Sequence, residues 1–138
     1  MAAECINIST VLRNMGRLDE ALEYHKKALE IDEKELNNKA GMAKACRNIG
    51  TVLWNMYRTE EALEYHQKAS EIHGALNDRI EIATDHYNMN FVYVERSDKP
   101  KALKCLSKAS EILEELERET NYHHPLIERI NKQISSLQ

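Results

Sequence analysis

The sequence predicts an all-α fold, in which three helical hairpins stack into a solenoid that a C-terminal capping helix closes. A pattern of twelve residues, first found at 20–31, returns at intervals of 41 and 40 residues. Apolar residues in each copy recur every three or four positions, as they do along one side of an α-helix. The 138 residues include only four glycines and two prolines. The chain is therefore poor in the turn residues that a β-sandwich or β-barrel needs.

A second, upstream element recurs with the same intervals. Residues 5–12 return at 46–53 and at 86–93, always ahead of a copy of the twelve-residue pattern. Two elements that shift together form one structural repeat. Each repeat is expected to be a pair of helices within a single domain spanning 1–138. The expected repeats are repeat one at about 2–36, repeat two at about 39–76 and repeat three at about 79–120.

Polar residues at the expected helix starts supply N-caps, because their side-chain oxygens can accept hydrogen bonds from free first-turn amides. Thr59 is expected to cap the second helix of repeat two, and Ser97 or Asp98 that of repeat three. Asp78 followed by Glu81 resembles a capping box at the start of repeat three.

Other signals mark the ends of helices. Gly16 is expected to close the first helix in a left-handed conformation, and Asn37 with Asn38 indicates a break before repeat two. The expected helices therefore lie at about 2–15, 18–36, 39–56, 59–76, 79–95 and 99–120.

A seventh helix is expected at about 124–137. Leu126, Ile130, Ile134 and Leu137 form one apolar stripe on an otherwise polar segment. Stacked repeats need a terminal element that buries the last apolar face and presents a polar surface to water. This segment suits that role.

No comparable cap is expected ahead of the first repeat. That end could be an exposed apolar surface, a cut from a longer chain or a contact with a second copy. The first helix carries apolar residues, including Ile8, Val11 and Leu12, that could meet a second copy of the chain. A structural, self-assembling unit is thus an alternative to a partner-binding module.

These repeats resemble the tetratricopeptide repeat (TPR) family, and repeat two fits the family pattern best. The usual first aromatic residue and final proline are missing. The interval of 40–41 residues resembles the longer subtype of kinesin light chains and of bacterial receptors for signalling peptides. The resemblance covers about residues 2–120 and implies a right-handed solenoid. The matching positions are Cys46, Ile49, Gly50, Leu53, Ala62, His66 and Ala69.

The resemblance implies that the first helix of each repeat lines a concave groove for an extended peptide. Asn7, Asn48 and Asn88 occupy one motif position in the three repeats. A carboxamide can pair with both the N–H and the C=O of a peptide backbone. The alternative is that each Asn bonds to its own helix or to a neighbouring one.

Side chains around these asparagines would select the partner. Aromatic rings in one half of the groove favour an apolar or aromatic anchor in the bound peptide, and cations in the other half favour acidic residues. Packing beneath a neighbouring helix is the alternative role for Trp54. The candidates, besides the three asparagines, are Arg13, Lys44, Arg47, Thr51, Trp54, Tyr87 and Phe91.

Composition narrows the possible functions. The formal net charge of −4 has the wrong sign for a general nucleic-acid binder. No apolar run approaches the ~20 residues that cross a membrane. Three cysteines at wide spacing indicate reduced thiols, and a cytoplasmic location is expected.

No catalytic or metal-binding motif stands out. The chain has no phosphate-binding loop, HExxH or GxSxG pattern. His25 and His66 stand where the family places a packing aromatic, so packing is the preferred interpretation over metal binding. We expect a non-catalytic protein-interaction module without a cofactor.

Overall fold

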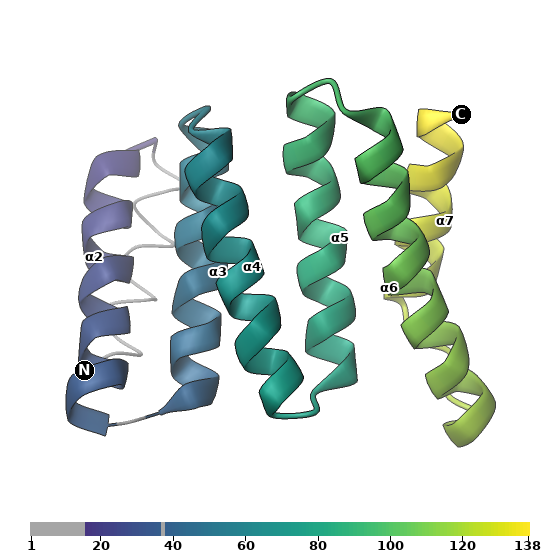
Figure 1. Cartoon of the computed structure of the whole chain (residues 1–138), viewed down its shortest axis with the longest axis horizontal. Helices are drawn as coiled ribbons and strands as arrows, with labels where there is room; N and C mark the ends of the chain where they lie inside the picture. Colours follow the sequence, from purple (N-terminus) through teal and green to yellow (C-terminus); the bar gives the residue numbers. More distant parts are fainter. Residues whose placement is uncertain (1–15, 37) are drawn as a thin grey trace. The chain divides into compact units, whose positions relative to one another are not determined.

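The computed structural model describes residues 16–36 and 38–138, with the backbone alone at 35–36. This part of the chain is all-α, as predicted, and Figure 1 shows its helices in chain order. The expected helix at 2–15 lies outside the described residues. The elements are α2 (Leu18–Ile31), the π-helical turn η1 (Asp32–Leu36), α3 (Lys39–Asn55), α4 (Thr59–Ala75), α5 (Arg79–Glu95), α6 (Lys99–Thr120) and α7 (Leu126–Leu137).

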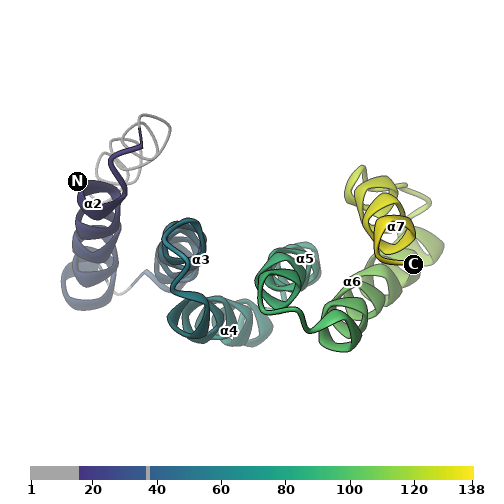
Figure 2. The same ribbon diagram turned by 90° about the horizontal axis from the view of Figure 1, so that it is seen from above.

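The chain divides into two compact units between Leu76 and Asn77. In the first unit, α3 packs against both α2 and α4. In the second unit, α5 and α6 form a hairpin and α7 packs against α6. Figure 2 shows each of these pairs side by side.

The turns directly ahead of α2, α4 and α6 each contain one residue in the left-handed conformation. These residues are Gly16, Tyr57 and Ser97, with φ values of 79°, 60° and 58°. They are repeat-equivalent, because the intervals between them are 41 and 40 residues. The left-handed conformation predicted for Gly16 is confirmed, whereas the helix that it was expected to close lies outside the described residues. Ser97 supplies this turn residue and is not the cap of α6.

Side-chain caps start three of the helices. Asn38 Oδ1 accepts from the Gly41 amide at 3.1 Å. In the same way, Asp78 Oδ1 accepts from the Glu81 amide at 3.3 Å, and Asp98 Oδ1 accepts from the Lys101 amide at 3.2 Å. The predictions for Asp78 and Asp98 are confirmed.

The predicted cap at Thr59 is wrong. Helix α4 begins at Thr59 itself, and Arg58 precedes it without a side-chain cap. The Arg58 guanidinium instead donates two hydrogen bonds to the Glu61 carboxylate, at 2.9 and 2.7 Å. Arg17 and Glu20 form the equivalent pair at the start of α2. A charge pair between the residue before the helix and the first turn has taken the place of a hydroxyl cap.

The capping helix starts at Leu126, two residues later than predicted. The reason is local, because His124 Nδ1 accepts a hydrogen bond from the Leu126 amide at 3.0 Å. The His124 imidazole thus satisfies the first amide of α7, although the residue directly before the helix, Pro125, supplies no side-chain cap.

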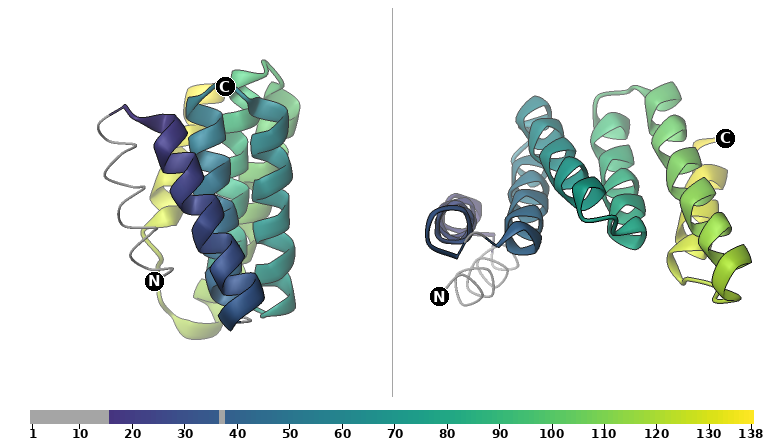
Figure 3. Two further views of the ribbon diagram at one scale, coloured as in Figure 1. Left: turned by 90° about the vertical axis from the view of Figure 1, so that its left-hand side faces the viewer. Right: turned by 60° about the horizontal axis from the view of Figure 1, so that its bottom comes forward.

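Helix α7 completes the core of the second unit, as the right-hand view in Figure 3 helps to follow. Its predicted stripe is confirmed: Leu126 and Ile130 are buried, whereas Ile134 and Leu137 are partly buried against the same cluster. The buried members of this cluster are Ala83, Leu106, Ala109, Leu113, Leu126, Ile127 and Ile130.

The first unit packs α3 closely against α4. A Cβ atom at Gly50 would lie only 2.8 Å from Cδ2 and Nε2 of His66. His66 is 1% exposed. Glycine is therefore needed here for space, since any larger residue would press on a buried ring.

Candidate functional site

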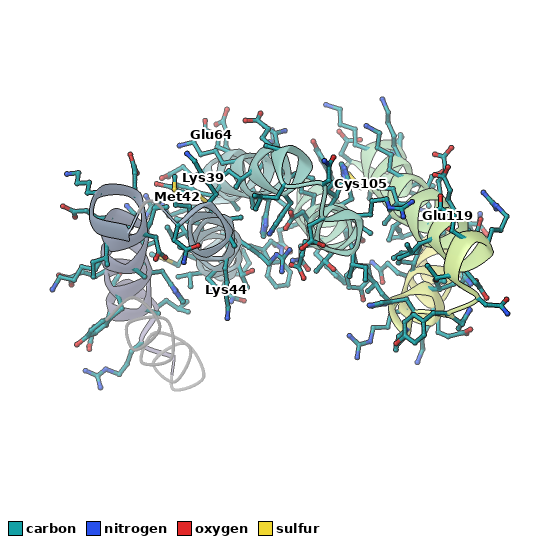
Figure 4. The ribbon with its side chains drawn as sticks, turned by 90° about the horizontal axis from the view of Figure 1, so that it is seen from below. Lys39, Met42, Lys44, Glu64, Cys105 and Glu119 are labelled. Atoms are coloured by element: carbon teal, nitrogen blue, oxygen red, sulfur yellow. The ribbon has the colours of Figure 1, made fainter. Side chains whose placement is uncertain are left out.

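Five of the predicted site residues lie along helix α3. Lys44 is exposed, and the other four are half-buried. Their spacing of one to three residues places them on one side of the helix. Figure 4 shows Lys44 projecting from α3 on the side away from Glu64 of α4. We name this surface the α3 face, and it consists of Lys44, Arg47, Asn48, Thr51 and Trp54.

Apolar residues on the opposite side fix the rotation of α3. Cys46, Ile49, Val52 and Leu53 are at most 3% exposed. Burying them against neighbouring helices leaves the residues between them turned outward. The α3 face is therefore a direct consequence of the apolar periodicity that the sequence displays.

Two members of the α3 face already bond to each other. Thr51 Oγ1 donates to the Arg47 carbonyl at 3.1 Å, within the helix. The hydroxyl proton of Thr51 is thus already used in a hydrogen bond to the backbone of its own helix. Its methyl group and the lone pairs of its hydroxyl oxygen are what it can offer to a partner.

Arg47 also acts on the buried face. Burial, followed by the positive charge of Arg47, lowers the pKa of His66 from 6.5 to about 4. His66 is therefore neutral near pH 7 and packs on Gly50. This supports the packing role expected for it.

Helix α5 carries the candidates of the second unit. Tyr87, Asn88 and Phe91 are all half-buried. The two rings meet edge to face, with centroids 5.2 Å apart and an interplanar angle of 86°. Tyr87 also packs against the core cluster of this unit. Part of its ring is thus structural, whereas Asn88 keeps an exposed portion.

Sequence reasoning missed Asn90, which is fully buried two residues beyond Asn88. Its Nδ2 donates to the Tyr87 carbonyl, and its Oδ1 accepts from Gln133 Nε2 of α7 at 2.9 Å. The available signal was its position, because Asn90 stands 40 residues after Gly50. A polar residue at a closely packed position needs partners.

His123 bridges the end of α6 and the start of α7. Its Nδ1 lies 3.1 Å from Glu117 Oε1, and its Nε2 lies 2.9 Å from Glu128 Oε1. Hydrogen bonds to these carboxylates raise the pKa of His123. Two glutamates of α6 are thus paired, since Glu119 also binds Arg79 at 2.7 Å.

The other candidate residues are either buried or outside the described part of the chain. Asn7 and Arg13 lie outside the described residues. His25 is buried in α2, and Cys46 is buried in α3. Within residues 16–36 and 38–138, no three His, Cys, Asp or Glu side chains come together in a way that could hold a metal ion.

Helix pairs repeated every 40–41 residues define a helical repeat protein. The family model of the tetratricopeptide repeat matches residues 2–73 and again 41–115. The chain therefore belongs to the tetratricopeptide repeat family. No curated protein sequence matches it.

Solved structures share this fold over almost the whole chain. The apo form of RapI has a TM-score of 0.84 and 23% identity, and the match covers 99% of this chain and 47% of that one. BtubC from P. vanneervenii has a TM-score of 0.84 and 17% identity, with 99% and 54% covered. Repeats of a putative kinesin light chain from Podospora anserina have a TM-score of 0.79 and 12% identity, with 98% and 64% covered. The chain spans about half the length of the first two.

At these identities the likeness establishes the fold, and the predicted all-α solenoid class is confirmed. Membership in the family makes the chain a protein-interaction module in the general sense. Among the described helices, none is long and apolar enough to cross a membrane.

Proposed function

We propose that this protein is a non-catalytic module that binds an extended segment of a partner protein through the faces of its first helices. The observation that carries the proposal is the α3 face. There Lys44 is exposed, and Arg47, Asn48 and Trp54 are half-buried on the same side of the helix. Of the Trp54 indole, Nε1 is buried, so only other parts of the ring are accessible. Family membership supports a binding role but names no partner.

Asn48 would hold the peptide backbone. A carboxamide donates and accepts side by side, so it can pair with one peptide unit whatever its side chain. Asn88 on α5 is half-buried in the same motif position. Asn7 would complete the series from repeat one.

Selectivity would come from the two ends of the α3 face. Lys44 and Arg47 favour carboxylates in the first part, with Arg13 adding to them, and Trp54 favours a large apolar residue in the second. Residues 44 and 54 are separated by about 15 Å along a helix axis. An extended segment covers that distance in about five residues. Tyr87 and Phe91 would offer a further aromatic surface on α5.

A display library of random peptides of about twelve residues tests the proposal. We expect the unchanged chain to select peptides that combine acidic residues with a large apolar residue. The variant Arg47→Glu, Asn48→Ala should lose most of this binding. Gln67→Ala, Lys68→Glu is the matched control, because it changes a neighbouring amide and cation on the exposed side of α4.

Equal loss in the control variant would remove the α3 face from the proposal. Failure of the unchanged chain to select any peptide would contradict the proposed function altogether. In that case, a molecular mass that rises with protein concentration would favour self-assembly.

A further inference from the structure

Tyr57 occupies an energetically unfavourable position. Its φ of 60° is left-handed, a region in which a bulky side chain crowds its own backbone. The equivalent turns use Gly16 and Ser97, which are smaller. A tyrosine is thus a poor local choice for this turn.

The folded structure gives little packing in return. Tyr57 is 77% exposed, the highest value among the exposed large apolar residues of the described chain. Its backbone N–H does donate to the Trp54 carbonyl at 3.0 Å, but any residue except proline could make that bond. Strain that the fold does not require is found where the side chain has another use.

The turn follows directly on the C-terminal end of α3, and Tyr57 stands three residues after Trp54. The hydrogen bond to Trp54 holds the two residues within one turn of each other. Tyrosine and tryptophan together offer a large contact area at a small cost in side-chain entropy. A large apolar side chain of a partner could then lie against both rings.

We propose that Tyr57 is a specificity-determining contact residue, which together with Trp54 receives an aromatic or large aliphatic side chain of the bound peptide. This inference rests on the proposed function. It adds a residue that the family pattern does not supply. It also predicts that stability and binding respond in opposite directions to one substitution.

The experiment uses the full chain and a labelled peptide containing two glutamates and, about five residues further on, a tryptophan. Tyr57→Gly should raise the urea midpoint, because glycine adopts positive φ freely, and should weaken peptide binding at least fivefold. Tyr57→Asn should weaken binding equally, since asparagine tolerates this conformation but lacks the ring. Ser97→Gly, in the equivalent turn of the second unit, should raise the midpoint without changing the affinity.

A result in which Tyr57→Gly and Tyr57→Asn bind the peptide as tightly as the unchanged chain would overturn the inference. The proposed function would survive that result if Arg47→Glu, Asn48→Ala still weakened binding. Loss of binding together with a lowered urea midpoint in both Tyr57 variants would also overturn it, because the ring would then be structural. No binding of this peptide by the unchanged chain would overturn the proposed function as well.

Discussion

Repeats two and three fill the same packing position in different ways. In repeat two, Gly50 on α3 makes room for the ring of His66 on α4. In repeat three, the equivalent residues are Asn90 and Leu106, both fully buried. Where repeat two has a glycine and a histidine, repeat three has an asparagine and a leucine.

The two repeats differ in the polar group that they bury and in how the fold compensates for burying it. Repeat two buries a titratable ring whose pKa falls to about 4. Repeat three buries a carboxamide, which gains a partner when Gln133 of α7 donates to it at 2.9 Å. The buried Asn90 of the second unit therefore receives its hydrogen bond from the capping helix. In repeat two, the buried His66 ring fits because Gly50 has no Cβ atom.

The largest effect should come from filling that empty position. Gly50→Val should destabilise the protein by about 3 kcal/mol, because the new atoms would overpack a buried ring. Urea unfolding measures the total loss of stability, and hydrogen exchange should show that the loss of protection is in α3 and α4. His66→Ala in the same chain should recover part of it. Equal stability of Gly50→Val and the unchanged chain would show that the ring moves aside freely.

Acid should destabilise repeat two next most strongly. The folded-state pKa of His66 lies near 4, below its ordinary 6.5, so protonation favours the unfolded chain. The stabilisation is complete above pH 6.5 and is lost as the pH falls towards 4. We expect a loss of about 2 kcal/mol between pH 7 and 5.

His66→Leu, which imports the residue found in repeat three, is the control for this pH dependence. Urea titrations at several pH values should give a shallower decline for that variant. An unchanged slope would mean that other groups cause the acid sensitivity.

Removing the donor from α7 tests the other side of the comparison. Gln133→Ala should cost about 1 to 2 kcal/mol, because Asn90 Oδ1 would lose its donor in a buried site. Lys132→Ala, at an exposed neighbour on α7, should have little effect. A double-mutant cycle with Asn90→Ala measures the coupling. Additive losses would show that the bond contributes nothing.

The smallest effect concerns the second helices of the two hairpins. Asp98→Ala should cost about 1 kcal/mol, since α6 would lose its side-chain cap. Thr59→Ala is the matched control, because α4 has no such cap. Thermal unfolding of both variants checks the difference. A similar fall in the unfolding temperature of both variants would indicate that Thr59 caps α4 after all.

Much of the fold was predictable because it rests on local rules. Apolar spacing predicted the described helices, Asp78 and Asp98 predicted the starts of two of them, and Gly16 predicted a left-handed residue ahead of α2. The error at Thr59 arose because a hydroxyl cap and an Arg–Glu pair can satisfy the same first turn. The sequence contains both the hydroxyl and the Arg–Glu pair, but it does not indicate which of the two is the stronger interaction at this helix start.

For the candidate site, the sequence predicted which side of α3 faces outward, but it did not predict how each residue packs. The α3 face follows from periodicity, because the buried positions leave its residues outward. The division of Tyr87 between packing and exposure could not be foreseen, since it depends on residues of α6 and α7. Nothing in the residues around Tyr57 announces a left-handed turn except its alignment with Gly16.

The sequence by itself determined the repeat, its period, the helices and the outward side of α3, because each depends on residues a few positions apart. The tertiary structure decided which polar groups far apart in the chain become partners. Asn90 meets Gln133 across 43 positions of the chain, and Arg79 meets Glu119 across 40. Such contacts depend on the packing of whole helices, and local periodicity carries no information about them.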